Sequence, residues 1–109
     1  MTAFQALYAK AAQEDIKQIY RYIAFSLREP ETAKQQIRRI RSGIRSLQNF
    51  PYRFSCVEWE PWHSMAMHRM PVDRYLVFYL CDRQAKTVTI VRVFYGGRDI
   101  TAIINNEQA

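Results

Sequence analysis

The fold is decided by the stretch Tyr75-Leu-Val-Phe-Tyr-Leu-Cys-Asp-Arg-Gln-Ala-Lys-Thr-Val-Thr-Ile-Val-Arg-Val-Phe-Tyr-Gly-Gly-Arg-Asp99. Two runs of β-branched and aromatic residues in it flank a polar turn at residues 82–86, and this pattern predicts a β-hairpin. Both faces of each run are apolar, so we expect the two strands to lie in the centre of a sheet. The second run ends in Gly96 and Gly97, which free the backbone to turn, and Arg98 follows at the mouth of the sheet.

Length and composition indicate one packed domain over residues 1–109. Apolar residues make up 49% of the chain and only three residues are glycine, which is typical of a globular protein rather than a disordered one. No apolar run approaches the roughly 20 residues of a membrane-spanning helix, and the N-terminus has no apolar signal core. We therefore expect a cytoplasmic protein that does not enter a membrane.

Two amphipathic helices are predicted before the hairpin. Residues 4–9 alternate loosely and predict a short first strand. From Ala11 onward, apolar residues recur every three or four positions, which predicts a helix that ends before Pro30. A second helix follows and ends near Pro51. The predicted apolar stripes are Ala12, Ile16, Ile19, Tyr20, Ile23 and Leu27 in the first helix and Ala33, Ile37, Ile40, Ile44 and Leu47 in the second.

The remaining segments complete an α+β fold. Residues 54–64 look irregular, and residues 66–72 predict a strand whose Pro71 suits a sheet edge. A short tail helix or strand is predicted around Ile100, Ile103 and Ile104, docked on the sheet. The expected order is strand, helix, helix, three strands and a short tail, with the helical hairpin packed on one face of a small, mostly antiparallel sheet.

Cysteine usage gives no sign of a metal site or another cofactor. Cys56 and Cys81 lie far apart and show no metal-ligand spacing, so we expect two small hydrophobic side chains in a reducing compartment. The net charge of +6 is more informative, because a small basic domain suits a polyanion or an acidic protein partner.

A basic stripe runs along the second helix beside its apolar seam. Residues 30–50 hold five positive charges and one negative charge. Two interpretations stay open, a surface for ribosomal RNA or another phosphate backbone, and a solvated helix face whose long side chains lie along the core edge. The stripe consists of Lys34, Arg38, Arg41 and Arg45.

Three arginines, Arg69, Arg92 and Arg98, lie on or beside predicted strands. The guanidinium of an arginine can bind a phosphate with two hydrogen bonds. A metal-independent ribonuclease also needs groups that remove and donate protons. His68 and Tyr95 are the candidates for that role and Glu58 is a weaker one. The alternatives are a half-buried strand histidine for His68, a strand-end ring packed on the tail for Tyr95, and a loop carboxylate for Glu58. We take Arg69, Arg98, Tyr95 and His68 as candidate catalytic residues, and Arg92 with the helix stripe as candidate nucleic-acid contacts.

The succession of a tyrosine-rich strand, a short turn, a Val/Ile strand with an internal arginine, and Gly96-Gly97-Arg98-Asp99 resembles the RelE/ParE family of bacterial toxins. The resemblance covers essentially the whole chain. It implies the toxin of a type II toxin–antitoxin pair, held inactive in a hetero-oligomer by a small antitoxin. The implied docking surfaces are the apolar tail around residues 100–104 and the grooves beside the helical hairpin.

The same resemblance leaves the target open. The ribosome-dependent nucleases of this family carry basic residues at three positions. These are the strand before the hairpin, the first hairpin strand just after its tyrosine, and the residues just after the last strand. Here Arg69 or His68 matches the first position and Arg98 the third, whereas the second falls on Leu76. No tyrosine follows Tyr95, although such enzymes often carry one near the C-terminus.

Several mechanisms are therefore retained. We favour ribosome-dependent cleavage of mRNA slightly over ParE-like inhibition of DNA gyrase by protein contact. A catalytically degenerate toxin that acts with its antitoxin as a co-repressor is a further alternative. A non-toxin RNA-binding module is the most distant one, because the strands lack a recognised RNA-binding motif.

Overall fold

The computed structural model describes residues 3–98, 100 and 103–104. Its helices and strands follow the expected order, β1 (Gln5–Tyr8), α1 (Lys10–Arg21), η1 (Tyr22–Ser26), α2 (Pro30–Ser46), β2 (His68–Val72), β3 (Tyr75–Asp82) and β4 (Thr87–Tyr95). The predicted tail falls partly outside the described residues, and Ile100, Ile103 and Ile104 within it are helical.

The four strands form one sheet in the order β1-β4-β3-β2. The short β1 is parallel to β4, and the other two pairs are antiparallel. The hairpin strands β3 and β4 therefore occupy the centre, and β2 with Pro71 lies at an edge, as predicted. One residue of β4, Val91, is extra in the ladder, since Tyr79 pairs with Ile90 and Phe78 with Arg92.

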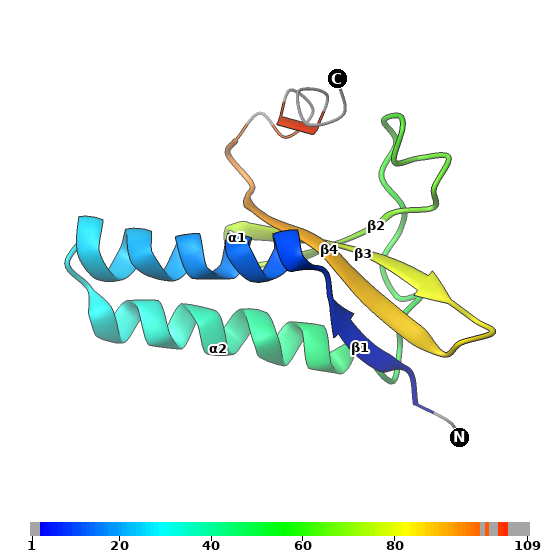
Figure 1. Ribbon diagram of the computed structural model, residues 1–109, viewed down its shortest axis with the longest axis horizontal. Coiled ribbons are helices and arrows are strands. Elements are labelled where there is room, and N and C mark those ends of the chain that lie inside the picture. The colour runs from blue at the N-terminus through cyan, green and yellow to red at the C-terminus, as the bar shows by residue number, and fades with distance from the viewer. Residues whose placement is uncertain (1–2, 99, 101–102, 105–109) are drawn as a thin grey trace.

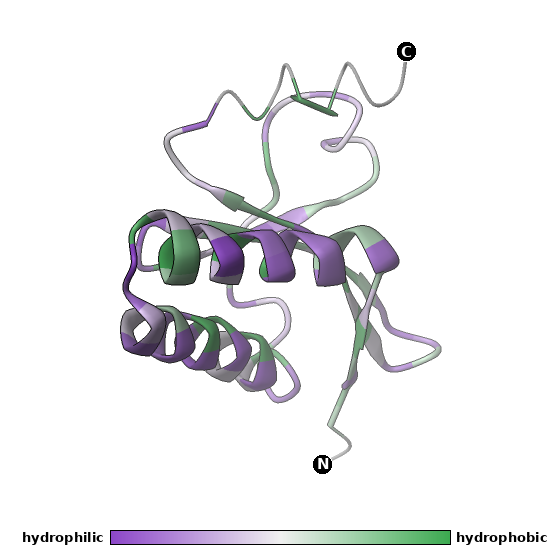
Figure 2. Ribbon diagram, turned by 60° about the vertical axis from the view of Figure 1, so that its left-hand side comes forward, coloured by the Kyte–Doolittle hydropathy of each residue, from purple (hydrophilic) through white to green (hydrophobic). Residues whose placement is uncertain are grey.

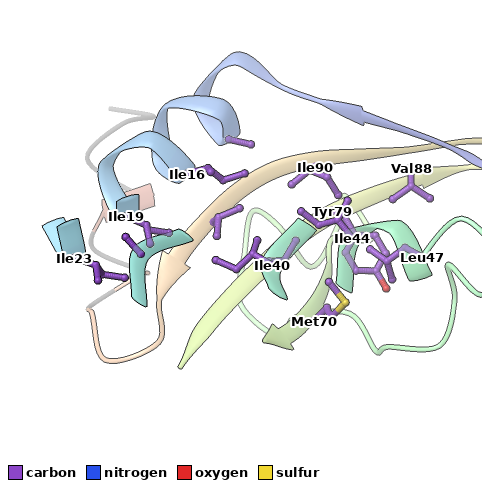
Figure 3. Close-up of a cluster of buried hydrophobic side chains, with 14 of the residues drawn as sticks. Ile16, Ile19, Ile23, Ile40, Ile44, Leu47, Met70, Tyr79, Val88 and Ile90 are labelled. Carbon is purple, nitrogen blue, oxygen red and sulfur yellow. The ribbon is translucent and has the colours of Figure 1, made fainter. Parts of the chain in front are cut away.

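The helical hairpin covers one face of the sheet. Figure 1 shows α1 and α2 side by side and antiparallel, and Figure 2 shows hydrophobic and hydrophilic residues alternating along them. This first core consists mainly of the predicted stripes packed on alternate residues of the strands. Figure 3 shows it, including Ile16, Ile19 and Ile23 from the first helical segment, Ile40 and Ile44 from α2, and Met70, Tyr79 and Ile90 from the sheet.

The end of the first helix differs from the prediction. The sequence pattern places Leu27 on the buried stripe, but its side chain is 52% exposed. The α-helix ends at Arg21 and continues as the π-helical segment η1, whose wider turn rotates the following residues relative to the stripe. Ala24 is buried in consequence, and the chain leaves the helix at Arg28, which has a φ of 57°.

A second core covers the opposite face of the sheet. The loop between α2 and β2 contributes Val57, Trp62 and Met67, which pack with the C-terminal residues against the strands. Ile100 and Ile104 are buried there, so the predicted docking of the tail is confirmed. For the same reason these two residues are not a free docking surface for a partner, which corrects that part of the expectation.

Candidate functional site

A groove of about 890 Å³ opens between the helical hairpin and the end of the sheet where β4 stops. One wall comes from α1 and η1, and the other comes from β3, β4 and the residues after β4. The lining is mixed, with apolar and aromatic side chains beside arginines. Residues that line it include Ile19, Tyr22, Leu27, Tyr75, Tyr95 and Arg98.

Large apolar side chains are exposed at this groove. Tyr22, Leu27 and Tyr95 line it and are 57%, 52% and 43% exposed, and Phe25 on η1 is 71% exposed. The π-helical turn contributes to this, because Leu27 leaves the apolar stripe after it. Clusters of exposed apolar side chains mark surfaces that contact other proteins. Sequence reasoning missed Tyr22 and Phe25, although aromatic residues off the buried stripe were the available signal.

The floor of the groove is held by Asp15 of α1. Its carboxylate accepts hydrogen bonds from the Arg92 guanidinium at 2.7 and 3.0 Å and from the Val93 N–H at 3.0 Å. Because β1 pairs with β4 only as far as Ile90, these bonds satisfy part of the strand edge beyond it. Nothing in the spacing of Asp15 along the sequence signalled this contact.

A second polar contact fixes the turn between β2 and β3 against α2. The Asp73 carboxylate accepts hydrogen bonds from Gln36 Nε2 at 3.0 Å and from Arg39 Nη2 at 2.6 Å. These bonds, with the nearby Arg39 charge, lower the pKa of Asp73. The turn between β2 and β3 is therefore joined to α2 through Asp73 and Gln36, and both residues line the groove.

Two tyrosines meet at the strand ends beside the groove. Tyr75 and Tyr95 pair across β3 and β4, and their ring centroids lie 5.8 Å apart. Burial, together with the neighbouring Tyr95, raises the pKa of Tyr75. This phenol therefore stays protonated at neutral pH, and the exposed Tyr95 is the member of the pair open to a partner.

The glycines after β4 are required for space rather than for backbone freedom. No described glycine has a positive φ, which corrects the reason expected from the sequence. A Cβ on Gly96 would lie 3.2 Å from the Arg74 carbonyl oxygen, to which the Gly96 N–H donates a hydrogen bond. A Cβ on Gly97 would lie 2.6 Å from the Tyr95 ring, so Gly97 leaves room for that ring.

Of the four candidate catalytic residues, the structure brings only Tyr95 and Arg98 to the groove. His68 shares the helix-covered face of the sheet with its pairing partner Tyr79, and its ring stacks on Tyr79 at 5.0 Å. It is 8% exposed, and its Nδ1 lies 2.7 Å from the Phe54 carbonyl oxygen, which can only accept a hydrogen bond. These contacts describe a packed side chain.

Arg69 lies on the other face of the sheet. It pairs with Phe78, a member of the second core, so the two side chains share that face. Arg69 is exposed and is not among the residues that line the groove. Arg98 lies near the end of β4, where its Cζ is 5.6 Å from the Phe94 ring centroid, and Glu58 is an exposed residue of the loop before β2.

The candidate nucleic-acid contacts form two groups. Lys34, Arg38, Arg41 and Arg45 are all exposed on α2. Within that group Lys34 lies 3.5 Å from Glu31, and the Arg41 guanidinium lies over the Tyr8 ring. Arg92 instead binds Asp15 and lies over Phe94 at 4.5 Å. A role of any of these residues in nucleic-acid binding stays a prediction.

The two cysteines are free and half-buried. Burial, with a contribution from Cys56, raises the pKa of the Cys81 thiol to about 11. No group of three or more His, Cys, Asp or Glu side chains in the described part of the chain is arranged to hold a metal ion. Within the same residues, no helix is both long enough and apolar enough to cross a membrane.

Comparison with known proteins identifies the family. The model of the ParE toxin of the type II toxin–antitoxin system parDE matches residues 6–100, which is most of the chain. The chain belongs to the ParE toxin family. It is thus the toxin of a type II toxin–antitoxin system. No curated protein matches this ParE toxin significantly by sequence.

Solved structures share the fold. A chain of the chromosomal ParDE toxin–antitoxin system from P. aeruginosa superposes with a TM-score of 0.69 at 17% identity, covering 85% of this ParE toxin and 96% of that chain. A chain of the RelBE2 toxin–antitoxin complex from Mycobacterium tuberculosis superposes with a TM-score of 0.62 at 17% identity, covering 87% of this toxin and 93% of that chain. A chain of the archaeal RelE–RelB complex from Pyrococcus horikoshii superposes with a TM-score of 0.61 at 18% identity, covering 90% of this toxin and 99% of that chain. At such identities these likenesses establish the α+β fold alone.

Proposed function

We propose that this ParE toxin arrests growth by inhibiting DNA gyrase through protein contact, with the groove as the contact surface. The observation that carries the proposal is that the exposed side chains of Tyr22, Leu27 and Tyr95 line one groove. The separation of His68 and Arg69 from Tyr95 supports it, because acid–base chemistry needs these groups around one phosphate.

The partner that silences the toxin is proposed to be a cognate antitoxin. The similar structures from Mycobacterium tuberculosis and Pyrococcus horikoshii are toxin–antitoxin complexes. The groove combines apolar lining with Arg74 and Arg98, so it suits an amphipathic segment that carries acidic residues. An antitoxin seated there would cover the surface that contacts gyrase.

Brief expression in growing cells tests this proposal. Messenger RNA ends and plasmid supercoiling are measured in the same culture, and we expect supercoiling to fall while messages stay intact. Leu27→Ser should weaken the effect, because it removes an exposed apolar side chain from the lining of the groove. Lys17→Gln, an exposed change elsewhere on α1, is the matched control. Cleaved messages with unchanged supercoiling would contradict gyrase inhibition.

Ribosome-dependent mRNA cleavage is the second candidate, because Tyr95 and Arg98 both line the groove and Tyr95 is exposed. In that case the phenol would exchange a proton and the guanidinium would hold the phosphate. Tyr95→Phe separates the two mechanisms. It keeps the ring that a protein contact needs and removes the hydroxyl that a nuclease needs, so toxicity that survives this change opposes cleavage.

A further inference from the structure

A second surface lies at the opposite end of the sheet from the end of β4. Three segments meet there, the residues before β1, the loop after α2, and the turn between β3 and β4. In Figure 1 the start of β1 and that turn lie at the same end of the sheet. We define this basal patch as Phe4, Phe50, Tyr52, Arg53, Arg83 and Lys86.

Hydrogen bonds hold the three segments together. The Phe4 N–H donates to the Gln48 carbonyl at 2.8 Å, and the Gln5 N–H donates to the Lys86 carbonyl at 2.8 Å. The buried Tyr79 hydroxyl donates a hydrogen bond to the Pro51 carbonyl at 2.8 Å, which anchors the loop after α2 to β3. The side chains of the basal patch therefore project from a fixed backbone.

Aromatic rings and cations alternate on this surface. The Arg83 guanidinium carbon lies 4.5 Å from the Tyr52 ring centroid, and the Lys86 ammonium lies 5.1 Å from that of Phe4. The rings of Phe4 and Tyr52 meet edge to face at 6.1 Å. Tyr52 is 42% exposed and Phe50 is 60% exposed, so both rings offer area to a ligand.

The charge of the basal patch is positive. Arg53, Arg83 and Lys86 are all exposed. The acidic residue in the β3–β4 turn is Asp82, and its Oδ1 accepts hydrogen bonds from the N–H groups of Gln84 at 2.9 Å and Ala85 at 3.0 Å. That carboxylate stabilises the turn. Arg53 Nη2 donates a hydrogen bond to the neutral Ser46 Oγ at 2.8 Å, so its charge and those of Arg83 and Lys86 remain to meet an anionic ligand.

We propose that the basal patch binds single-stranded RNA. Proteins that bind single strands combine cations that follow the phosphates with aromatic rings and guanidinium planes on which unpaired bases stack. Phe50 and the Tyr52–Arg83 pair supply the stacking surfaces, and Arg53, Arg83 and Lys86 supply the charge. The exposed amides of Asn49 and Gln84 offer donors and acceptors to ribose hydroxyls. This inference is independent of gyrase inhibition and would stand if that proposal failed.

Fluorescence anisotropy with a labelled 12-nucleotide oligouridine and the full chain tests the proposal. We expect binding that weakens with salt, with a slope of log K against log salt of about −2, since three cations meet phosphates of a single strand. Tyr52→Ala should reduce affinity about tenfold through lost stacking, whereas Tyr52→Phe should keep it. Lys17→Gln, which removes a charge outside the patch, should change affinity less than about twofold.

Four results would overturn the proposal. They are equal affinity of Tyr52→Ala and the wild-type chain, equal binding of a 12-base-pair RNA duplex, equal binding of oligothymidine, and displacement of the RNA by polyglutamate at matched charge. The last result would mean that charge alone acts and that an acidic protein is the better ligand. Thermal unfolding of each variant shows whether it is folded. Arg83→Gln changes only an exposed side chain and provides a second test, with an expected loss of RNA affinity of about fivefold.

Discussion

Asp15 and Arg92 form an ion pair that joins α1 to β4, with Arg92 Nε 2.7 Å from Asp15 Oδ2. The side chains of Arg92 and Asp15 are only 15% and 14% exposed, and Asp15 Oδ2 also accepts a hydrogen bond from the Val93 N–H. This pair lies where β1 stops and the groove begins, so it fixes the distance between the helical hairpin and the open end of the sheet.

Removal of the Asp15 carboxylate is expected to destabilise the toxin. Asp15→Ala leaves the Arg92 charge and the Val93 N–H without this partner, which should lower the free energy of unfolding by about 3 kcal/mol. Urea unfolding measures the loss. The double variant Asp15→Ala/Arg92→Ala should be less destabilised than the sum of the single variants. Additive effects would show that the pair makes no net contribution.

Gly96 and Gly97 should respond differently to alanine. A Cβ at Gly96 meets the Arg74 carbonyl oxygen, which is backbone and cannot turn aside, so Gly96→Ala should cost about 1 kcal/mol or more. A Cβ at Gly97 meets the exposed Tyr95 ring, which can rotate, so Gly97→Ala should cost less. Urea unfolding compares the two variants. An equal or larger loss for Gly97→Ala would contradict this account.

The Cys81 thiol should react slowly with alkylating reagents. Burial raises its pKa to about 11, so at pH 8 only about 0.1% is thiolate, against roughly a quarter of an ordinary thiol. We expect alkylation of Cys81 in the folded wild-type chain to be about two hundred times slower than in denaturant. Mass spectrometry of the peptide that contains Cys81 follows the modification. Similar rates in the two states would show that the thiol is accessible and ionises normally.

Stability should depend on pH through Asp73. Hydrogen bonds from Gln36 and Arg39 lower its pKa in the folded chain below the unfolded value of about 3.9. Its stabilising contribution is therefore complete above that value and is lost as the pH falls through the folded pKa. The stability difference between wild type and Asp73→Asn should be present at pH 7 and shrink below about pH 4. A stability difference between wild type and Asp73→Asn that grows as the pH falls would contradict a lowered pKa of Asp73 in the folded chain.

Periodicity predicted the fold because apolar spacing reports which faces are buried, and the stripes through Ile16 and Ile44 are buried as expected. It failed at Leu27, because a π-helical turn changes the residue spacing without any proline or glycine to mark it. The candidate site was predicted only in part. Tyr95 and Arg98 are close in sequence and stay together, whereas His68 and Arg69 alternate along one strand and so point to opposite faces.

The surfaces missed by the sequence analysis arise from contacts between distant segments. Asp15 meets Arg92 across 77 positions, and Arg83 meets Tyr52 only because the loop after α2 returns to the β3–β4 turn. Exposure of aromatic residues such as Phe25 and Phe50 is visible only once the packing of the remainder is known. Local pattern therefore predicts the layers of this fold better than its surfaces.

Purified gyrase tests the central claim most directly. The wild-type toxin, the Leu27→Ser variant and the Tyr95→Phe variant are each titrated into a supercoiling reaction. In parallel, each is added to a reconstituted translation reaction whose mRNA ends are mapped. We predict inhibition of supercoiling that Tyr95→Phe retains and Leu27→Ser weakens, with the mRNA intact. Supercoiling that proceeds normally at excess toxin, while ribosome-bound mRNA is cut in a Tyr95-dependent manner, would contradict the account.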